Sequence, residues 1–189
     1  MTPTRTHLMI LIASLASSLP MAQGCERTPP EPPAQTSWSW RGDDVGVALR
    51  LDSSWEQLDP RVIHERAVFA ARAERDRFSL HMLVVDLPGG DALEHDLGQL
   101  RSQSVDQLAQ NVGDFELDRQ GPLTLDGRAG HSVFALGDVG GVRYSFLLVY
   151  VIDAGRLYQV VATSREADSQ ELARRVDGAL VSWEFLDGT

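Results

Sequence analysis

The sequence predicts an α+β fold in which helices cover an antiparallel sheet, and three observations predict it. Apolar residues alternate with smaller or polar ones along several short segments, which is the period of a half-buried strand. These segments follow one another through tight turns, so neighbouring strands run antiparallel. Two other segments carry apolar residues at intervals of three and four, the period of an amphipathic helix. Successive hairpins exclude a doubly wound parallel sheet, in which strands and helices alternate throughout.

The first strands are expected at 45–51 and 67–73. Apolar residues alternate along the first of them, and the polar residues 52–54 end it. The charged residues 74–77 then form a hairpin turn that leads into a third strand over 78–85.

The third strand presents two different faces. Alternate residues from Phe78 to Val84 point to one side of the sheet, and His81 points to the other. His64, His81 and His131 are scattered singly along the chain. An isolated imidazole of this kind is more typical of a hydrogen-bonded core or surface residue than of a metal ligand.

The first helix is expected to begin at Asp91 and to end at a Gly113 cap. Its apolar residues fall on one stripe: Leu93, Leu97, Leu100, Leu108 and Val112. The first turn carries the acidic residues Asp91, Glu94 and Asp96 together with His95. Acidic residues there complement the free N–H groups and the helix dipole. A divalent-cation site is the alternative, although the alternating ligands and the glycine of a calcium loop are missing.

Short strands at 115–118 and 123–125 precede the tight turn Asp126-Gly127, and a longer strand follows over 129–136. The glycine-rich residues 137–141 are interpreted as a hairpin turn. A phosphate-binding loop would need a lysine and a following helix, and this segment has neither.

The strand over 142–152 is apolar on nearly both faces, so we expect it to be central in the sheet and covered on each side. Residues 153–155 turn the chain into a last long strand over 156–163. A final amphipathic helix is expected over 168–181, with Trp183 at the end of its apolar stripe.

The N-terminus has the layout of a secretory signal peptide, residues 1–24. Arg5 precedes the apolar run 8–19, and Pro20 and small residues separate that run from Cys25. The apolar run has 12 residues. A membrane-spanning helix needs about 20, so the run predicts export rather than a membrane span.

Residues 22–25 resemble the lipobox of bacterial lipoproteins, in which cleavage exposes a cysteine that is then acylated. The resemblance is incomplete, because Ala22 stands where leucine is usual and Gln23 where a small residue is usual. Cys25 is the only cysteine of the chain, and a lone thiol in an oxidising compartment needs an explanation. Acylation supplies one, so we expect a lipid anchor at Cys25. A secreted soluble protein with an incidental cysteine is the alternative.

Residues 25–36 are expected to form a proline-rich tether. The segment after Cys25 contains four prolines and no large apolar residue, so it cannot build a core. Extended polyproline II at about 3.1 Å per residue would hold a domain roughly 30 Å from its anchor. A disordered leader without a spacing role is the alternative.

The remaining residues, 37–189, suffice for one domain with a single core. The net charge of −10 repels nucleic acid, so no nucleic-acid partner is expected. Every basic residue is arginine. The missing lysine excludes phosphate-loop lysines, Schiff bases and Ser-x-x-Lys nucleophiles. With Cys25 at the N-terminus, thiol catalysis and cysteine zinc sites are also excluded.

The order of elements resembles the PsbP-like family, which includes the DcrB-type lipoproteins of the bacterial cell envelope. The resemblance spans 38–186 and includes a Gly-Val-x-Leu-x-Leu strand (46–51), a Leu-x-Leu-x-Gly segment (123–127) and a final Ser-Trp-x-Phe (182–185). It implies an α/β/α sandwich of PsbP-like type that serves as an accessory or binding module rather than as an enzyme. No motif of this chain matches a functional motif of the family, so the resemblance assigns no site residues.

Two further motifs favour structure over chemistry. The segment Gly130-His131-Ser132-Val133 begins like a nucleophile elbow, but Phe134 replaces the second glycine and the segment lies inside a predicted strand. Three tryptophans cluster at the entrance to the domain: Trp38, Trp40 and Trp55. An aromatic platform for a glycan or a peptide is one interpretation, and packing at the sheet edge is the favoured one.

The best candidate binding surface is the long hairpin. Tyr144, Tyr150 and Tyr158 line it, and Arg143 stands beside them. If one face of the sheet is partly open, these residue types are those that contribute most to protein interfaces.

These observations predict a lipid-anchored, non-enzymatic protein of the cell envelope that binds another envelope protein. It is expected to lie at the periplasmic or outer face of a membrane and to need no metal or cofactor. The alternative is an exported domain that binds a small ligand or a cation in a cleft between helix and sheet. An enzyme would need titratable side chains that converge in one cleft, and the sequence does not place any together.

Overall fold

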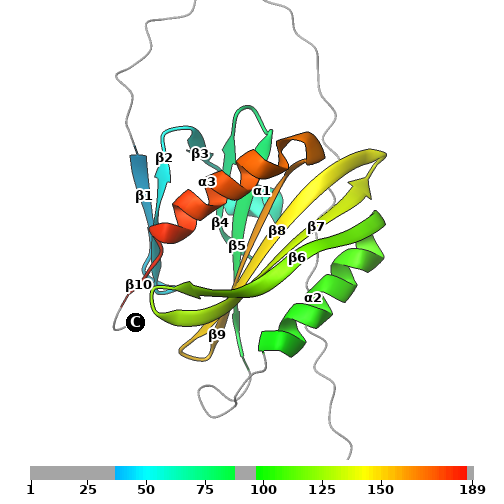
Figure 1. The fold of residues 1–189 in the computed structure, drawn as a ribbon. Coiled ribbons are helices and arrows are strands. Elements are labelled where there is room, and N and C mark those ends of the chain that lie inside the picture. The colour runs from blue at the N-terminus through cyan, green and yellow to red at the C-terminus, as the bar shows by residue number, and fades with distance from the viewer. Residues whose placement is uncertain (1–36, 88–96, 187–189) are drawn as a thin grey trace, which may run out of the picture.

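Two antiparallel sheets form the framework of the computed structural model, which describes residues 37–87 and 97–186 (Figure 1). The larger sheet has seven strands in the order β3-β4-β5-β9-β8-β7-β6, and the smaller has three in the order β1-β2-β10. The strands are β1 (Ser37–Gly42), β2 (Val47–Asp52), β3 (Trp55–Gln57), β4 (Ala67–Ala73), β5 (Phe78–Asp86), β6 (Gly113–Leu125), β7 (Arg128–Val139), β8 (Val142–Asp153), β9 (Arg156–Arg165) and β10 (Glu184–Phe185). The helices are α1 (Pro60–Ile63), α2 (Leu97–Asn111) and α3 (Ser169–Val181), with a 3₁₀ turn, η2 (Glu166–Asp168), before α3.

The expected signal peptide (1–24), the tether with Cys25 (25–36) and the acidic residues 91–96 lie outside the described residues. They stay predictions.

α2 and α3 pack against opposite faces of the large sheet, which confirms the α+β sandwich (Figure 1). Leu172 and Val176 of α3 belong to the first core cluster, which also includes the inward residues of β2. Leu108 of α2 belongs to a second core cluster on the other face. These are called the α3-side core and the α2-side core below.

The alternation of residues along the strands explains why both faces are covered. On β8, Leu147 and Val149 enter the α3-side core, and Phe146 and Leu148 enter the α2-side core. β8 lies between β7 and β9. The prediction of a central strand over 142–152 that is buried on both sides is therefore confirmed.

Backbone conformation confirms the predicted turn at Asp126-Gly127, where both residues have positive φ, 44° and 78°. The expected turn over 137–141 is shorter than predicted, because only Gly140 and Gly141 have positive φ. Gly137 lies inside β7, where a Cβ atom would sit 2.5 Å from Val112 Cγ2. This glycine is needed for the close approach of α2 to the sheet.

Two local predictions are wrong. The expected short strands at 115–118 and 123–125 are one continuous strand, β6, with irregularities of register between Gly113 and Glu116 and between Leu117 and Arg119. Gly113 opens β6 instead of capping α2 in the left-handed conformation, and the neighbouring Asp114 has the positive φ, 41°.

The tryptophans at the domain entrance pack against the sheet, which is the interpretation that the sequence favoured. Trp38 and Trp40 lie on β1, a strand that the sequence analysis did not include, and their rings lie 6.3 and 4.9 Å from the ring of Phe69. Trp38 Nε1 donates to the Trp55 carbonyl at 2.8 Å. These contacts fasten the small sheet to the large one.

Candidate functional site

The four residues predicted as a binding surface do not share one surface. Tyr150 is 0% exposed and Tyr158 is 3% exposed, so both are core residues. Tyr150 belongs to the α2-side core and Tyr158 to the α3-side core. The reason is the strand register: Tyr150 pairs with Gln159, so Tyr158, one residue earlier on β9, points to the opposite face. The predicted common surface is therefore wrong.

Tyr158 has a structural role. Its hydroxyl donates to the Val45 carbonyl at 2.9 Å, and its ring packs edge-on against Trp183 and Phe185. Burial raises the pKa of Tyr158 above its ordinary value, and Arg156 opposes this rise. This tyrosine ties the C-terminal strand β10 and the β1–β2 connection to the sheet.

Arg143 is engaged by acidic groups from three neighbouring elements. Its guanidinium lies 3.0 Å from Glu116, 3.4 Å from Asp138 and 3.9 Å from Glu166. Nη1 also donates to the Asp114 carbonyl at 2.6 Å. The side chain is 27% exposed. Its role as a binding residue stays a prediction, because most of its hydrogen-bonding capacity is already used within the fold.

Tyr144 belongs to an apolar surface at the tip of the β7–β8 hairpin. Tyr144, Phe115 and Val139 are half-buried and pack against the α2-side core. Val142 is two residues before Tyr144 on β8, and Leu117 pairs with the core residue Ala135, so both share that face. Val142 is 38% exposed and Leu117 is 40% exposed. These five residues are called the hairpin-end patch below.

A buried polar group lies beneath α2. Gln159, Tyr150 and His131 occupy adjacent positions on β9, β8 and β7, so they form one row across the sheet. Ser104 of α2 is 3% exposed and Gln159 is 2% exposed. Burial raises the pKa of the Tyr150 hydroxyl, and the nearby Ser104 and Gln159 side chains counter that rise in part. The hydroxyl completes no hydrogen bond of ordinary geometry.

The three histidines of the described residues do not gather into a catalytic or metal site. His81 lies on the α2-facing side of β5, with Nδ1 buried and without a hydrogen-bond partner. Burial, together with a smaller effect of the nearby His64, lowers the pKa of His81 to about 4. His64 Nδ1 accepts from the Arg66 backbone N–H at 3.1 Å. Within 37–87 and 97–186, no three His, Cys, Asp or Glu side chains are grouped to hold a metal ion.

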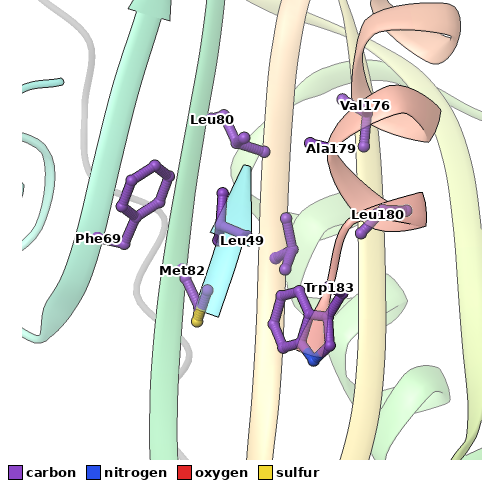
Figure 2. A pocket seen from close by; sticks show the side chains of 9 residues that line it. Leu49, Phe69, Leu80, Met82, Val176, Ala179, Leu180 and Trp183 are labelled. Carbon is purple, nitrogen blue, oxygen red and sulfur yellow. The ribbon is translucent and has the colours of Figure 1, made fainter. Parts of the chain in front are cut away.

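A small gap lies between α3 and the sheet (Figure 2). Its volume is about 10 Å³, which is room for a single water. Small-molecule sites typically occupy about 300 Å³ or more. Apolar and aromatic side chains line the gap: Leu49, Phe69, Leu80, Met82, Val160, Val176, Ala179, Leu180 and Trp183.

The segment that begins like a nucleophile elbow lies inside a strand, as predicted. The segment Gly130–Val133 lies within β7, so Ser132 does not sit on the strand-to-helix turn that a nucleophile elbow requires.

Among the described helices, none combines the length and the hydropathy of a membrane span.

Gln159, Ser104 and Arg101 were not among the predicted site residues, although the sequence carries a signal for them. Gln159 interrupts the apolar run of the last long strand, and Ser104 and Arg101 lie between the stripe residues Leu100 and Leu108. A polar residue at an apolar position is the informative exception in such a pattern.

The fold and these contacts define an antiparallel sandwich with an apolar gap under one helix and a polar group under the other. No protein-family model matches the chain. No curated protein matches it either.

Solved structures do match. The cyanobacterial PsbP (CyanoP) of Synechocystis sp. PCC 6803 has a TM-score of 0.62 at 15% identity, covering 85% of this chain and 98% of that protein. LpqN of Mycobacterium tuberculosis, a protein involved in cell envelope biogenesis, has a TM-score of 0.59 at 13% identity, covering 79% and 90%. The Ran-binding protein Mog1p of Saccharomyces cerevisiae has a TM-score of 0.55 at 6% identity, covering 80% and 96%. This chain therefore has a PsbP-like fold.

Proposed function

We propose that this protein is a lipid-anchored accessory protein of the cell envelope that binds another envelope protein and catalyses no reaction. The export signal, Cys25 and the proline-rich tether support the location. The similarity in fold to LpqN, a protein involved in cell envelope biogenesis, supports this location. The proposed class is a DcrB-type lipoprotein.

The observation that carries the binding function is the hairpin-end patch. Four large apolar residues in the described part of the chain are exposed: Val62, Leu117, Val142 and Val181. Two of them, Leu117 and Val142, share one face and one end of the sheet with three half-buried apolar side chains. Val62 lies on α1 and Val181 on α3, apart from this patch. Grouped apolar exposure marks an interaction surface, whereas single exposed apolar residues are ordinary.

The charges at this end of the sheet favour a basic partner. Glu116, Asp138 and Glu166 surround Arg143 on the opposite face of the sheet from the patch, and Asp114 and Asp118 on β6 are exposed. Three carboxylates around one guanidinium leave a negative balance. An apolar centre with a charged rim is the usual anatomy of a protein interface.

Site-specific photo-crosslinking in the protein's own membranes tests this proposal. A photoreactive amino acid replaces Val142 in the full-length chain, and the matched control places it at Val181, which is more exposed at 88%. We expect a discrete protein adduct from position 142 that disappears when Leu117→Glu is added, and no such adduct from position 181. Equal labelling at both positions, or no protein adduct at 142, would overturn the proposal.

A small-ligand or cation site in a cleft is the alternative function. The gap under α3 does not support it, because about 10 Å³ cannot hold a metabolite. The polar group under α2 is a different case and is treated next.

A further inference from the structure

Five polar side chains lie on the facing sides of α2 and the sheet. Tyr150, Gln159 and His131 come from adjacent strands, and Ser104 and Arg101 come from α2. They are called the α2 polar cluster below. Three of these residues are almost completely buried: Tyr150 at 0%, Gln159 at 2% and Ser104 at 3% exposure.

His131 Nδ1 and Arg101 Nε of this cluster are buried without a hydrogen-bond partner, and Tyr150 Oη, which lies near Ser104 and Gln159, completes no hydrogen bond of ordinary geometry. Ser104 Oγ donates to the Leu100 carbonyl at 3.0 Å, so its lone pairs are still free to accept. Buried polar atoms in folded proteins are nearly always paired, and a local group of unpaired ones indicates a water, an ion or a ligand.

Arg101 is unusual among the arginines of the described residues. Arg72, Arg128, Arg143, Arg156 and Arg175 are also partly buried, and each of them is paired with a carboxylate. Arg101 is partly buried, and no carboxylate within 37–87 and 97–186 is paired with it. It stands between Leu100 and Val105, which pack against the α2-side core, and three residues before Ser104, so it lies on the side of α2 that approaches the sheet.

The charge balance defines what this cluster can accept. The Arg101 guanidinium is the permanent charge of this cluster, and a positive charge disfavours a metal cation. A carboxylate would neutralise the guanidinium and can accept two of its N–H groups side by side. A phosphate dianion would leave one buried negative charge without a partner, which is costly in a water-poor interior.

We propose that the α2 polar cluster binds the carboxylate group of a small molecule, with Arg101 as its ionic partner and Tyr150 and His131 as hydrogen-bond partners. This site is separate from the hairpin-end patch and does not depend on the proposed protein-binding function. Arg101, Tyr150 and His131 would act as binding residues, and no chemical step is implied.

Titration of the full-length protein in detergent with ¹³C-labelled formate and acetate tests the site directly. Binding is followed by the carboxylate ¹³C signal and by the melting temperature, with chloride and inorganic phosphate at matched ionic strength as comparison anions. We expect saturable binding of the carboxylates, weakened at least 10-fold in Tyr150→Phe and lost in Arg101→Gln. Arg165→Gln removes an exposed arginine and is expected to leave binding unchanged.

Circular dichroism of each variant separates lost binding from lost folding. Should Arg101→Gln fail to fold, Arg101→Lys keeps the charge but not the two-pronged geometry, and a decrease of at least 3-fold is expected. The proposal is overturned if the carboxylates do not saturate the wild-type protein. It is equally overturned if phosphate or chloride has the same effect, or if folded Tyr150→Phe and Arg101 variants bind as the wild type does.

Discussion

Gly137→Ala tests the packing of α2 on the sheet, because it adds a single methyl group where there is no space for one. An ideal Cβ at this position lies 2.5 Å from Val112 Cγ2 and 3.1 Å from Val112 Cβ. Carbon atoms in contact are separated by about 3.5–4.0 Å, so the helix end or the strand must move by about 1 Å. Overpacking of a filled core costs about 1–3 kcal/mol, and we expect about 2 kcal/mol here.

A double-mutant cycle shows whether Val112 is the cause. Val112→Ala alone removes buried methyl groups and is expected to cost about 1–2 kcal/mol. In the double variant the alanine at 137 occupies the space that Val112 vacates, so the combined cost should fall short of the sum by at least about 1 kcal/mol. Gly121→Ala is the matched control, because nothing lies within 4 Å of its Cβ. That change should stay within about 0.5 kcal/mol of wild type.

Urea unfolding followed by tryptophan fluorescence measures the free energy of unfolding of the wild type and of all four variants. The packing argument is refuted if Gly137→Ala is as stable as Gly121→Ala, or if the costs of Gly137→Ala and Val112→Ala simply add.

Three further predictions concern single side chains. The pKa of His81 is lowered from 6.5 to about 4 in the folded protein, so the unfolded chain binds the proton first as the pH falls. The contribution of His81 to stability should be complete above pH 6.5 and decrease by at most about 3 kcal/mol towards pH 4. His81→Gln should flatten this part of the stability–pH curve. Tyr158→Phe leaves the Val45 carbonyl without its 2.9 Å hydrogen bond and should cost about 1–2 kcal/mol in urea unfolding; an unchanged midpoint would show that water replaces the hydroxyl. Tyr150→Phe in carboxylate-free buffer removes a buried hydroxyl that lies near Ser104 and Gln159 but completes no hydrogen bond of ordinary geometry, so it should be neutral or stabilising by up to about 1 kcal/mol. A clear loss of stability without any carboxylate would show that these side chains or water already pair the hydroxyl.

Most of the large sheet could be predicted because burial leaves a pattern in the sequence. The alternation in β5, the doubly apolar β8 and the Asp126-Gly127 turn each follow from residues close together in the chain. β6 was divided into two strands for the opposite reason. It is an edge strand that is exposed along most of its length, with Pro122 in its second half, so no apolar alternation marks it.

The candidate site was less predictable because it depends on register. Tyr150 and Tyr158 are both aromatic residues of one hairpin, yet the pairing of Tyr150 with Gln159 sends them to opposite cores. No local pattern contains that pairing. The position of Ser104 near Tyr150 likewise depends on how α2 packs across β7 and β8, which are distant from it in sequence.

The intact mass and the N-terminal residue of the protein, extracted from membranes of an acylating bacterium, test the proposed function most directly. The proposed location predicts a mature chain that begins at Cys25 and carries fatty acyl groups, and it predicts that Cys25→Ser incorporates no labelled fatty acid and leaves the membrane fraction. A wild-type chain that begins at another residue, or that is recovered unacylated in the soluble fraction, would contradict the lipid anchor.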